Sequence, residues 1–174
     1  VAGVAASMKL DRAWLRLAVF ALTAPVLWQF VGEHGGSGWR LAPAAVALAI
    51  YAMNVVAIGE RLARQAGRWL KADVLLFHLN ALGLFAGLYA IFDPVATAWM
   101  PPLALAIAAW HVALMWVWRS TSEEAGLNSL AVAFAMVGFA IGLQFDVWWS
   151  VVGWAIEAAA IVWVGLKSRR DWMR

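Results

Sequence analysis

The sequence contains no cysteine and few charged residues. The absence of cysteine excludes disulfide bonds, thiolate metal centres and a cysteine nucleophile. Of the 174 residues, 13% are charged and 65% are hydrophobic. Soluble domains have about 25% charged and roughly 45–50% apolar residues. This composition therefore excludes a soluble globular domain and predicts a core that is shared between protein and lipid.

Motifs of catalysis are also lacking. The sequence has no HExxH metal motif, no glycine-rich phosphate-binding loop and no Ser/His/Asp arrangement. Glu123 and Glu124 are adjacent acids, but they precede an apolar run and are typical of a solvated first turn of a helix. No catalytic residue and no metal ligand is predicted, and an enzyme is not the favoured interpretation.

Long apolar runs are abundant. A membrane-spanning helix needs about 20 mostly apolar residues, with a range of roughly 17–25. Asp93-Pro94 predicts a helix break, and Pro101-Pro102 suits the first turn of the next helix. We predict an all-α integral membrane protein with one transmembrane domain, residues 1–174, and six transmembrane helices in three antiparallel hairpins. The predicted spans are residues 15–31, 41–59, 74–92, 98–118, 127–145 and 148–166.

Basic residues are distributed unevenly across this predicted membrane. Of the 13 lysines and arginines, only Arg40 lies on one side, and all the others lie on the opposite side. The positive-inside rule therefore predicts that both termini are cytoplasmic. Because the basic residues are scattered between apolar runs and form no single patch, nucleic acid is not an expected partner.

The segment 60–71, between the second and third predicted spans, has apolar residues at helical spacing. Its basic residues flank that apolar stripe: Arg61, Arg64, Arg68 and Lys71. One interpretation is a short amphipathic helix that lies on the anionic lipids of the inner leaflet. The other is a cytoplasmic loop whose charges only set the topology.

Five polar residues lie inside the predicted spans: Asn54, His78, Asn80, His111 and Glu157. At 1.5 Å per residue, they lie about 8–13 Å from the cytoplasmic ends of their helices. We predict that they converge on one polar pocket in the cytoplasmic half of the membrane. This cluster is either a proton or ligand site or a set of packing contacts.

Glu157 is the one carboxylate in the middle of a predicted span. Burying an acid at the centre of a membrane helix costs roughly 2.5–3.5 kcal/mol. The side chain is therefore expected to be protonated or to have a partner on another helix, and His78 and His111 are the best candidates. Its two open roles are a proton, cation or head-group site and an interhelical contact that fixes packing.

His78 and His111 also allow a cofactor interpretation. They lie on successive antiparallel helices at similar depth, which suits bis-histidine haem ligation or binding of a chlorophyll-type pigment. Structural histidines are commoner than ligands, so the sequence predicts no cofactor outright.

The stretch LNSLAVAFAMVGFAIGLQFDVWWSVVGWAIEAAAIVWVGLKSRR, residues 127–170, resembles a recurring segment of a bacterial family of polytopic membrane proteins, the domain-of-unknown-function family 2339. The upstream run LLFHLNALGLFAGLYAIFD resembles the preceding helix of that family. The resemblance implies a bacterial inner-membrane protein and places Glu157 in the family motif. Family members are typically longer, with more spans, and have no established activity. The matching positions are Ala131, Phe134, Gln144, Trp149, Trp154, Glu157, Trp163 and Gly165.

Three function classes follow. The favoured class is a non-enzymatic subunit or scaffold of a larger membrane assembly, with the lipid bilayer and other membrane subunits as partners. The second is a carrier component that moves a proton, lipid or polar solute through a pocket around Glu157. The third is a haem- or pigment-associated subunit that uses His78 and His111.

Overall fold

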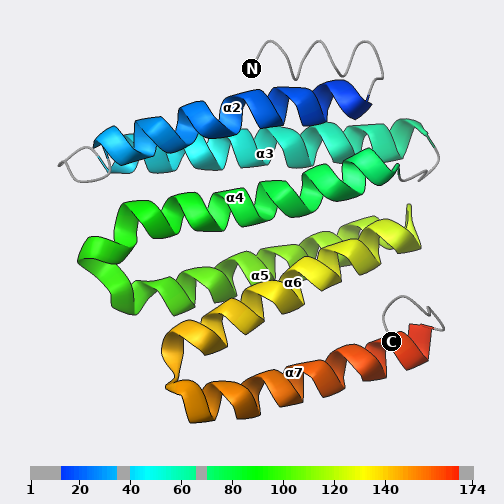
Figure 1. The fold of residues 1–174 in the computed structure, drawn as a ribbon. Helices are drawn as coiled ribbons and strands as arrows, with labels where there is room; N and C mark the ends of the chain where they lie inside the picture. Colours follow the sequence, from blue (N-terminus) through cyan, green and yellow to red (C-terminus); the bar gives the residue numbers. More distant parts are fainter. Residues whose placement is uncertain (1–12, 35–39, 66–69, 169–174) are drawn as a thin grey trace.

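The structure, a computed structural model, describes residues 13–34, 40–65 and 70–168, and this part of the chain is helical without β-strands (Figure 1). The all-α class is confirmed. The elements are α2 (Ala13–His34), α3 (Leu41–Arg64), α4 (Lys71–Ala96), the 3₁₀ helix η1 (Thr97–Trp99), α5 (Met100–Trp118), α6 (Glu123–Gln144) and α7 (Val147–Ser168).

Five of these helices are long and apolar enough to cross a membrane. The segments are Leu41–Arg64, Lys71–Asp93, Thr97–Trp118, Glu123–Gln144 and Val147–Leu166. The described part of α2 contains a shorter apolar segment, Leu17–Phe30, where the sequence predicted the first of six spans. By length and composition, the chain is therefore a multi-pass membrane protein, and its described residues contain five candidate spans.

Side-chain hydrogen bonds cap the helix ends, and one predicted helix end differs from the observed one. Ser122 accepts a hydrogen bond from the backbone N–H of Ala125, which caps α6. Asp146 accepts one from the N–H of Trp149 at the start of α7. The prediction that Asp93-Pro94 breaks the helix was wrong, because α4 continues to Ala96. The hydroxyl of Thr97 donates to the carbonyl of Asp93 at 2.7 Å, which satisfies an acceptor near the helix end.

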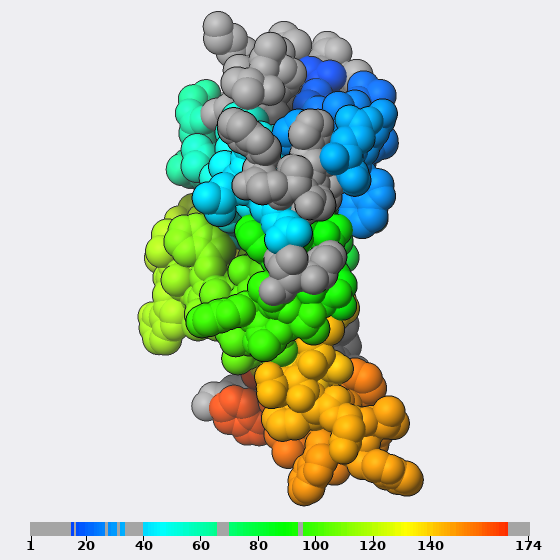
Figure 2. Space-filling model, turned by 90° about the vertical axis from the view of Figure 1, so that its left-hand side faces the viewer, coloured from blue at the N-terminus to red at the C-terminus, as the bar shows by residue number. Residues whose placement is uncertain are grey.

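The helices lie side by side in nearly their chain order (Figure 1). α2 packs on both α3 and α4, and α5 and α6 form the most closely packed pair. Seen from the side, the molecule is elongated, with α2 and α3 towards one end and α6 and α7 towards the other (Figure 2). The core runs through α3, α4, α5 and α6, and its fully buried side chains include Ile58, Phe77, Ile91 and Met136.

α7 is the least covered helix among the candidate spans. Only 11% of its apolar window is buried, against 39–50% for the other four. It packs against α6 at one edge of the array (Figure 1). Its large apolar side chains, including Trp148, Ile156 and Trp163, are mostly exposed. The α7 surface is therefore free to contact lipid or another protein.

Candidate functional site

A buried network of polar side chains joins α3, α4 and α5. The amide of Asn54 donates to Asn80 Oδ1 at 3.1 Å, and the amide of Asn80 donates to the carbonyl of Tyr51 at 3.1 Å. The hydroxyl of Tyr51 lies 3.1 Å from Nε2 of His111. All four residues are buried. In this apolar setting, the bonds fix the relative positions of three helices.

The hydrogen bonds of His111 define its tautomer. Nδ1 lies 2.9 Å from the carbonyl of Ile107, an acceptor only, so Nδ1 carries the proton. Nε2 therefore accepts from the Tyr51 hydroxyl. The ring is fully buried and also lies edge-on to Phe77, with centroids 5.4 Å apart. Both nitrogens are engaged in holding the helices together.

His78 lies outside this network. Its Nδ1 donates to the carbonyl of Val74 at 2.8 Å, and its ring lies edge-on to Phe77, with centroids 5.9 Å apart. The side chain lines an open groove between α4 and α6, together with Lys71 and Glu124. Of the five polar residues that were predicted to converge, Asn54, Asn80 and His111 lie in one network, and His78 faces a separate groove.

Glu157 lies at the middle of α7, on the face that packs against α6. A Cβ atom placed on Gly138 would be only 2.8 Å from Oε2 of Glu157, so the carboxyl lies directly on the α6 backbone. Trp154 donates from Nε1 to the carbonyl of Gly138 at 3.0 Å. Among the described residues, no hydrogen bond or ion pair joins Glu157 to His78 or His111. The expected acid–histidine pair does not form.

Glycines on both helices make this close approach possible. A Cβ on Gly142 would lie 3.1 Å from the Trp154 ring, and a Cβ on Gly153 would lie 2.6 Å from Ile141 Cγ2. Small residues recur along one face of α6, at Ala131, Ala135, Gly138 and Gly142, a pattern that is typical of helix packing in membranes. Gly138 and Gly142 form the packing seam with α7, whereas Ala135 is exposed.

The histidine pair does not fit a bis-histidine haem or pigment site. A ligating histidine needs one free ring nitrogen, and both nitrogens of His111 are hydrogen-bonded inside the core. Its nearest ring neighbours are Tyr51 and Phe77, which leave no open coordination position at the ring. We derive no chemistry from such a cofactor.

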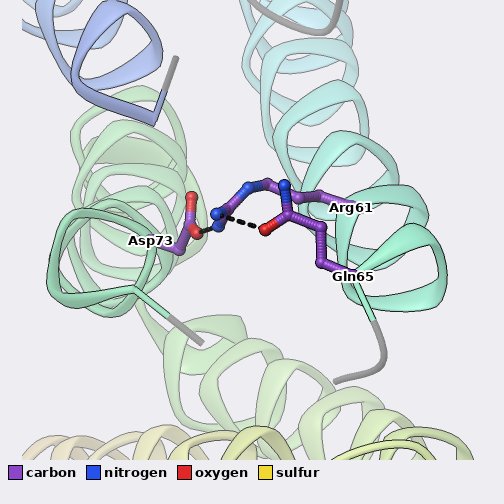
Figure 3. A network of polar contacts seen from close by, with 3 residues as sticks. All are labelled: Arg61, Gln65 and Asp73. Carbon is purple, nitrogen blue, oxygen red and sulfur yellow. Dashed lines mark hydrogen bonds and ion pairs between the residues drawn. The ribbon is translucent and has the colours of Figure 1, made fainter. Parts of the chain in front are cut away.

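The structure describes residues 60–65, 70 and 71 of the segment 60–71, for which the sequence left two interpretations open. Residues 60–64 complete α3, Lys71 begins α4, and Arg68 lies outside the described residues. Arg61 points inward, where it pairs with Asp73 of α4 and donates to Gln65 Oε1 at 2.8 Å (Figure 3). Arg64 is exposed and pairs with Glu60. Arg61 is thus a clamp between helices and is not available to anionic lipids, whereas Arg64 and Lys71 are exposed.

Two residues of this architecture were missed by sequence reasoning. Tyr51 links the network through its carbonyl and its hydroxyl, and Asp73 balances Arg61. The signal for Tyr51 was its position three residues before Asn54, on the same face of α3. The signal for Asp73 was an acid in the first turn of α4, opposite a run of arginines.

No protein-family model, curated protein or solved structure matches the chain.

Proposed function

We propose that this protein is a non-enzymatic subunit of a larger membrane assembly, and that α7 is the helix through which it contacts a partner. In this proposal, six helices cross a bacterial inner membrane, and both termini lie in the cytoplasm. The single observation that carries the proposal is the position of Glu157. A carboxyl group stands in the middle of the span that the rest of the described chain covers least.

A carboxyl group that is only partly covered by protein is costly within a bilayer. Glu157 is only partly buried, and its contact on α6 is backbone at Gly138. Ionisable groups at the bilayer centre almost always face other helices or a water-filled cavity. A helix from a partner, placed beside the α6–α7 seam, would remove the carboxyl from lipid and offer it a hydrogen-bond donor.

The exposed aromatic surface of α7 supports the same proposal. Trp148 is 84% exposed and Trp163 is 61% exposed, although both belong to a helix with a well-defined packed face. Large aromatic side chains are enriched at protein interfaces. They are also enriched at membrane surfaces. The exposed tryptophans support a protein interface here because they lie on the same helix as Glu157.

The resemblance to the domain-of-unknown-function family 2339 has the same implication. Members of that family have more spans than this chain, and the residues that carry the resemblance lie mainly in α6 and α7. We propose membership of that family. Further spans, within the same polypeptide or in a partner, would then lie against α7.

Site-specific photo-crosslinking tests the α7 interface directly. A photoreactive residue replaces Ile156, which is 68% exposed and adjacent to Glu157. The matched control replaces Leu105, which is 50% exposed on α5. We expect Ile156 to crosslink to a defined polypeptide in membranes and Leu105 to crosslink to lipid. Lipid adducts at both positions would contradict the proposal.

Transport is the second candidate, because no side-chain partner of Glu157 is found among the described residues and Glu157 lies in the middle of α7. Glu157→Gln keeps the size of the side chain and removes its charge. If the protein is a subunit, this variant still assembles and loses at most the hydrogen bond to its partner. A carrier would instead lose proton or solute flux in vesicles while its assembly stays intact.

A further inference from the structure

The groove between α4 and α6 carries a separate inference. It has a volume of about 560 Å³ and is open to the outside. Small-molecule sites typically have volumes of roughly 300–1,000 Å³, so the groove can hold a head group. Its lining residues come from the first two turns of α4 and of α6. They are Lys71, Val74, Leu75 and His78 from α4, and Glu124 and Asn128 from α6.

The two walls of the groove have complementary charge. Lys71 and His78 are seven residues apart on α4 and therefore share one face. Glu124 and Asn128 are four residues apart on α6 and also share one face. Lys71 and Glu124 form no ion pair with one another or with any other residue that the structure describes. Within the described ranges, the groove thus has an unpaired ammonium group on its α4 side and an unpaired carboxylate on its α6 side.

Two further polar atoms remain available. Nδ1 of His78 is used by the carbonyl of Val74, so Nε2 is the nitrogen left for a ligand. Asn128 is 7% exposed, and its amide nitrogen donates to the carbonyl of Glu124 at 2.8 Å. Its Oδ1 is therefore the atom of the amide that can accept a hydrogen bond from a ligand in the groove.

We propose that this groove binds the head group of a zwitterionic phospholipid that carries a primary ammonium group. The phosphate lies against the ammonium group of Lys71, and the ammonium group of the lipid donates to Glu124 and Asn128. Nε2 of His78, whose Nδ1 carries the ring proton, is a further acceptor in the groove. A purely anionic head group has no cation to place against the Glu124 carboxylate. A choline head group has no N–H donor for Asn128. Val74 and Leu75, the apolar residues of the groove, contact the start of the acyl chains.

This inference does not depend on the proposed subunit role. The groove lies on α4 and α6, and the proposed interface lies on α7. A failure of one proposal therefore leaves the other intact.

Native mass spectrometry of the full chain, delipidated and then titrated with defined lipids, tests the proposal. The lipids are phosphatidylethanolamine, phosphatidylcholine and phosphatidylglycerol with identical acyl chains. We expect phosphatidylethanolamine to bind about threefold to fivefold more tightly than either of the others, as suits a partly exposed ion pair. Equal binding of the three lipids would overturn the proposal.

Variants assign the preference to the groove. Glu124→Gln removes the carboxylate at constant size, and we expect the preference for phosphatidylethanolamine over phosphatidylcholine to disappear. The neighbouring Glu123→Gln is the matched control, because Glu123 is not part of the groove lining. Preference that survives Glu124→Gln, or that is lost equally in Glu123→Gln, would contradict the assignment. Unchanged helicity by circular dichroism confirms that each variant is folded.

Water-soluble glycerophosphoethanolamine, added as a competitor, distinguishes a lipid from a free head group. We expect displacement of the lipid only at a large excess of the competitor, because the soluble compound lacks acyl chains. Displacement at equal concentration would show that the groove takes the soluble molecule, and would overturn the lipid part of the proposal.

Discussion

At the scale of single residues, the close packing of α6 on α7 depends on glycines, which have no side chain. Gly138, Gly142 and Gly153 let a carboxyl group, a tryptophan ring and an isoleucine approach the backbone of the facing helix. The small-residue pattern of α6 was visible in the sequence, because spacing alone reveals it. The sequence did not reveal that Glu157 lies on Gly138, because this contact depends on how each helix is rotated about its own axis.

Gly138→Ala is expected to destabilise the protein by about 1 kcal/mol, the lower end for overpacking, because the flexible Glu157 side chain can shift. The measurement is the free energy of unfolding in mixed micelles. The control is Gly87→Ala, where an added Cβ has no neighbour within 4 Å. This control should be neutral or slightly stabilising, since alanine favours helix.

A double-variant cycle assigns the effect to Glu157. In a Glu157→Ala background, Gly138→Ala should cost much less, because the carboxyl group is gone. An equal cost in both backgrounds would mean that Glu157 does not lie on Gly138.

At the scale of helices, the sequence predicted the element positions well and the polar contacts only in part. Apolar runs located α3 to α7 within a few residues of their observed ends, because the length of a span is set by the membrane. The segment 60–71 was harder to predict. Its arginines looked alike in the sequence, but Arg61 faces α4 and Arg64 faces outward. Arg61 faces inward because it pairs with Asp73, which lies on the next helix. Helix periodicity within α3 does not reveal a contact with another helix.

Asp73→Asn is expected to destabilise the α3–α4 pair by about 3–5 kcal/mol, because it removes the charge that balances buried Arg61. The side chains of Arg61 and Asp73 are only 7% and 3% exposed. The control is Glu60→Gln, which breaks the exposed Glu60–Arg64 pair and should cost about 0.5 kcal/mol or less. Both values come from the same unfolding measurement, and similar costs for the two variants would contradict the distinction between a buried clamp and a surface pair.

At the scale of the whole molecule, the sequence predicted the all-α class and the multi-pass character. The residues of the predicted polar pocket, however, lie in three separate places in the structure. Asn54, Asn80 and His111 meet through Tyr51, His78 lines the α4–α6 groove, and Glu157 lies on α6. Equal depth brings side chains to one level of the membrane. It does not bring them to one point, because the helices form an extended array (Figure 1).

The topology is testable because the chain has no cysteine of its own. Single substitutions Ser120→Cys and Asp146→Cys place a thiol in the exposed turns at opposite ends of α6. A membrane-impermeant maleimide should label the Asp146→Cys variant in intact cells and the Ser120→Cys variant only after permeabilisation. The reverse pattern would contradict the prediction of cytoplasmic termini.

The most direct test of the proposed function is a native mass spectrum of the protein extracted gently from its own membrane. The proposal predicts a mass above that of the 19.0 kDa chain, with a second polypeptide released on activation. Glu157→Ala should weaken this complex without unfolding the protein. A lone 19.0 kDa chain that carries only lipid, under conditions that preserve other membrane complexes, would contradict the account.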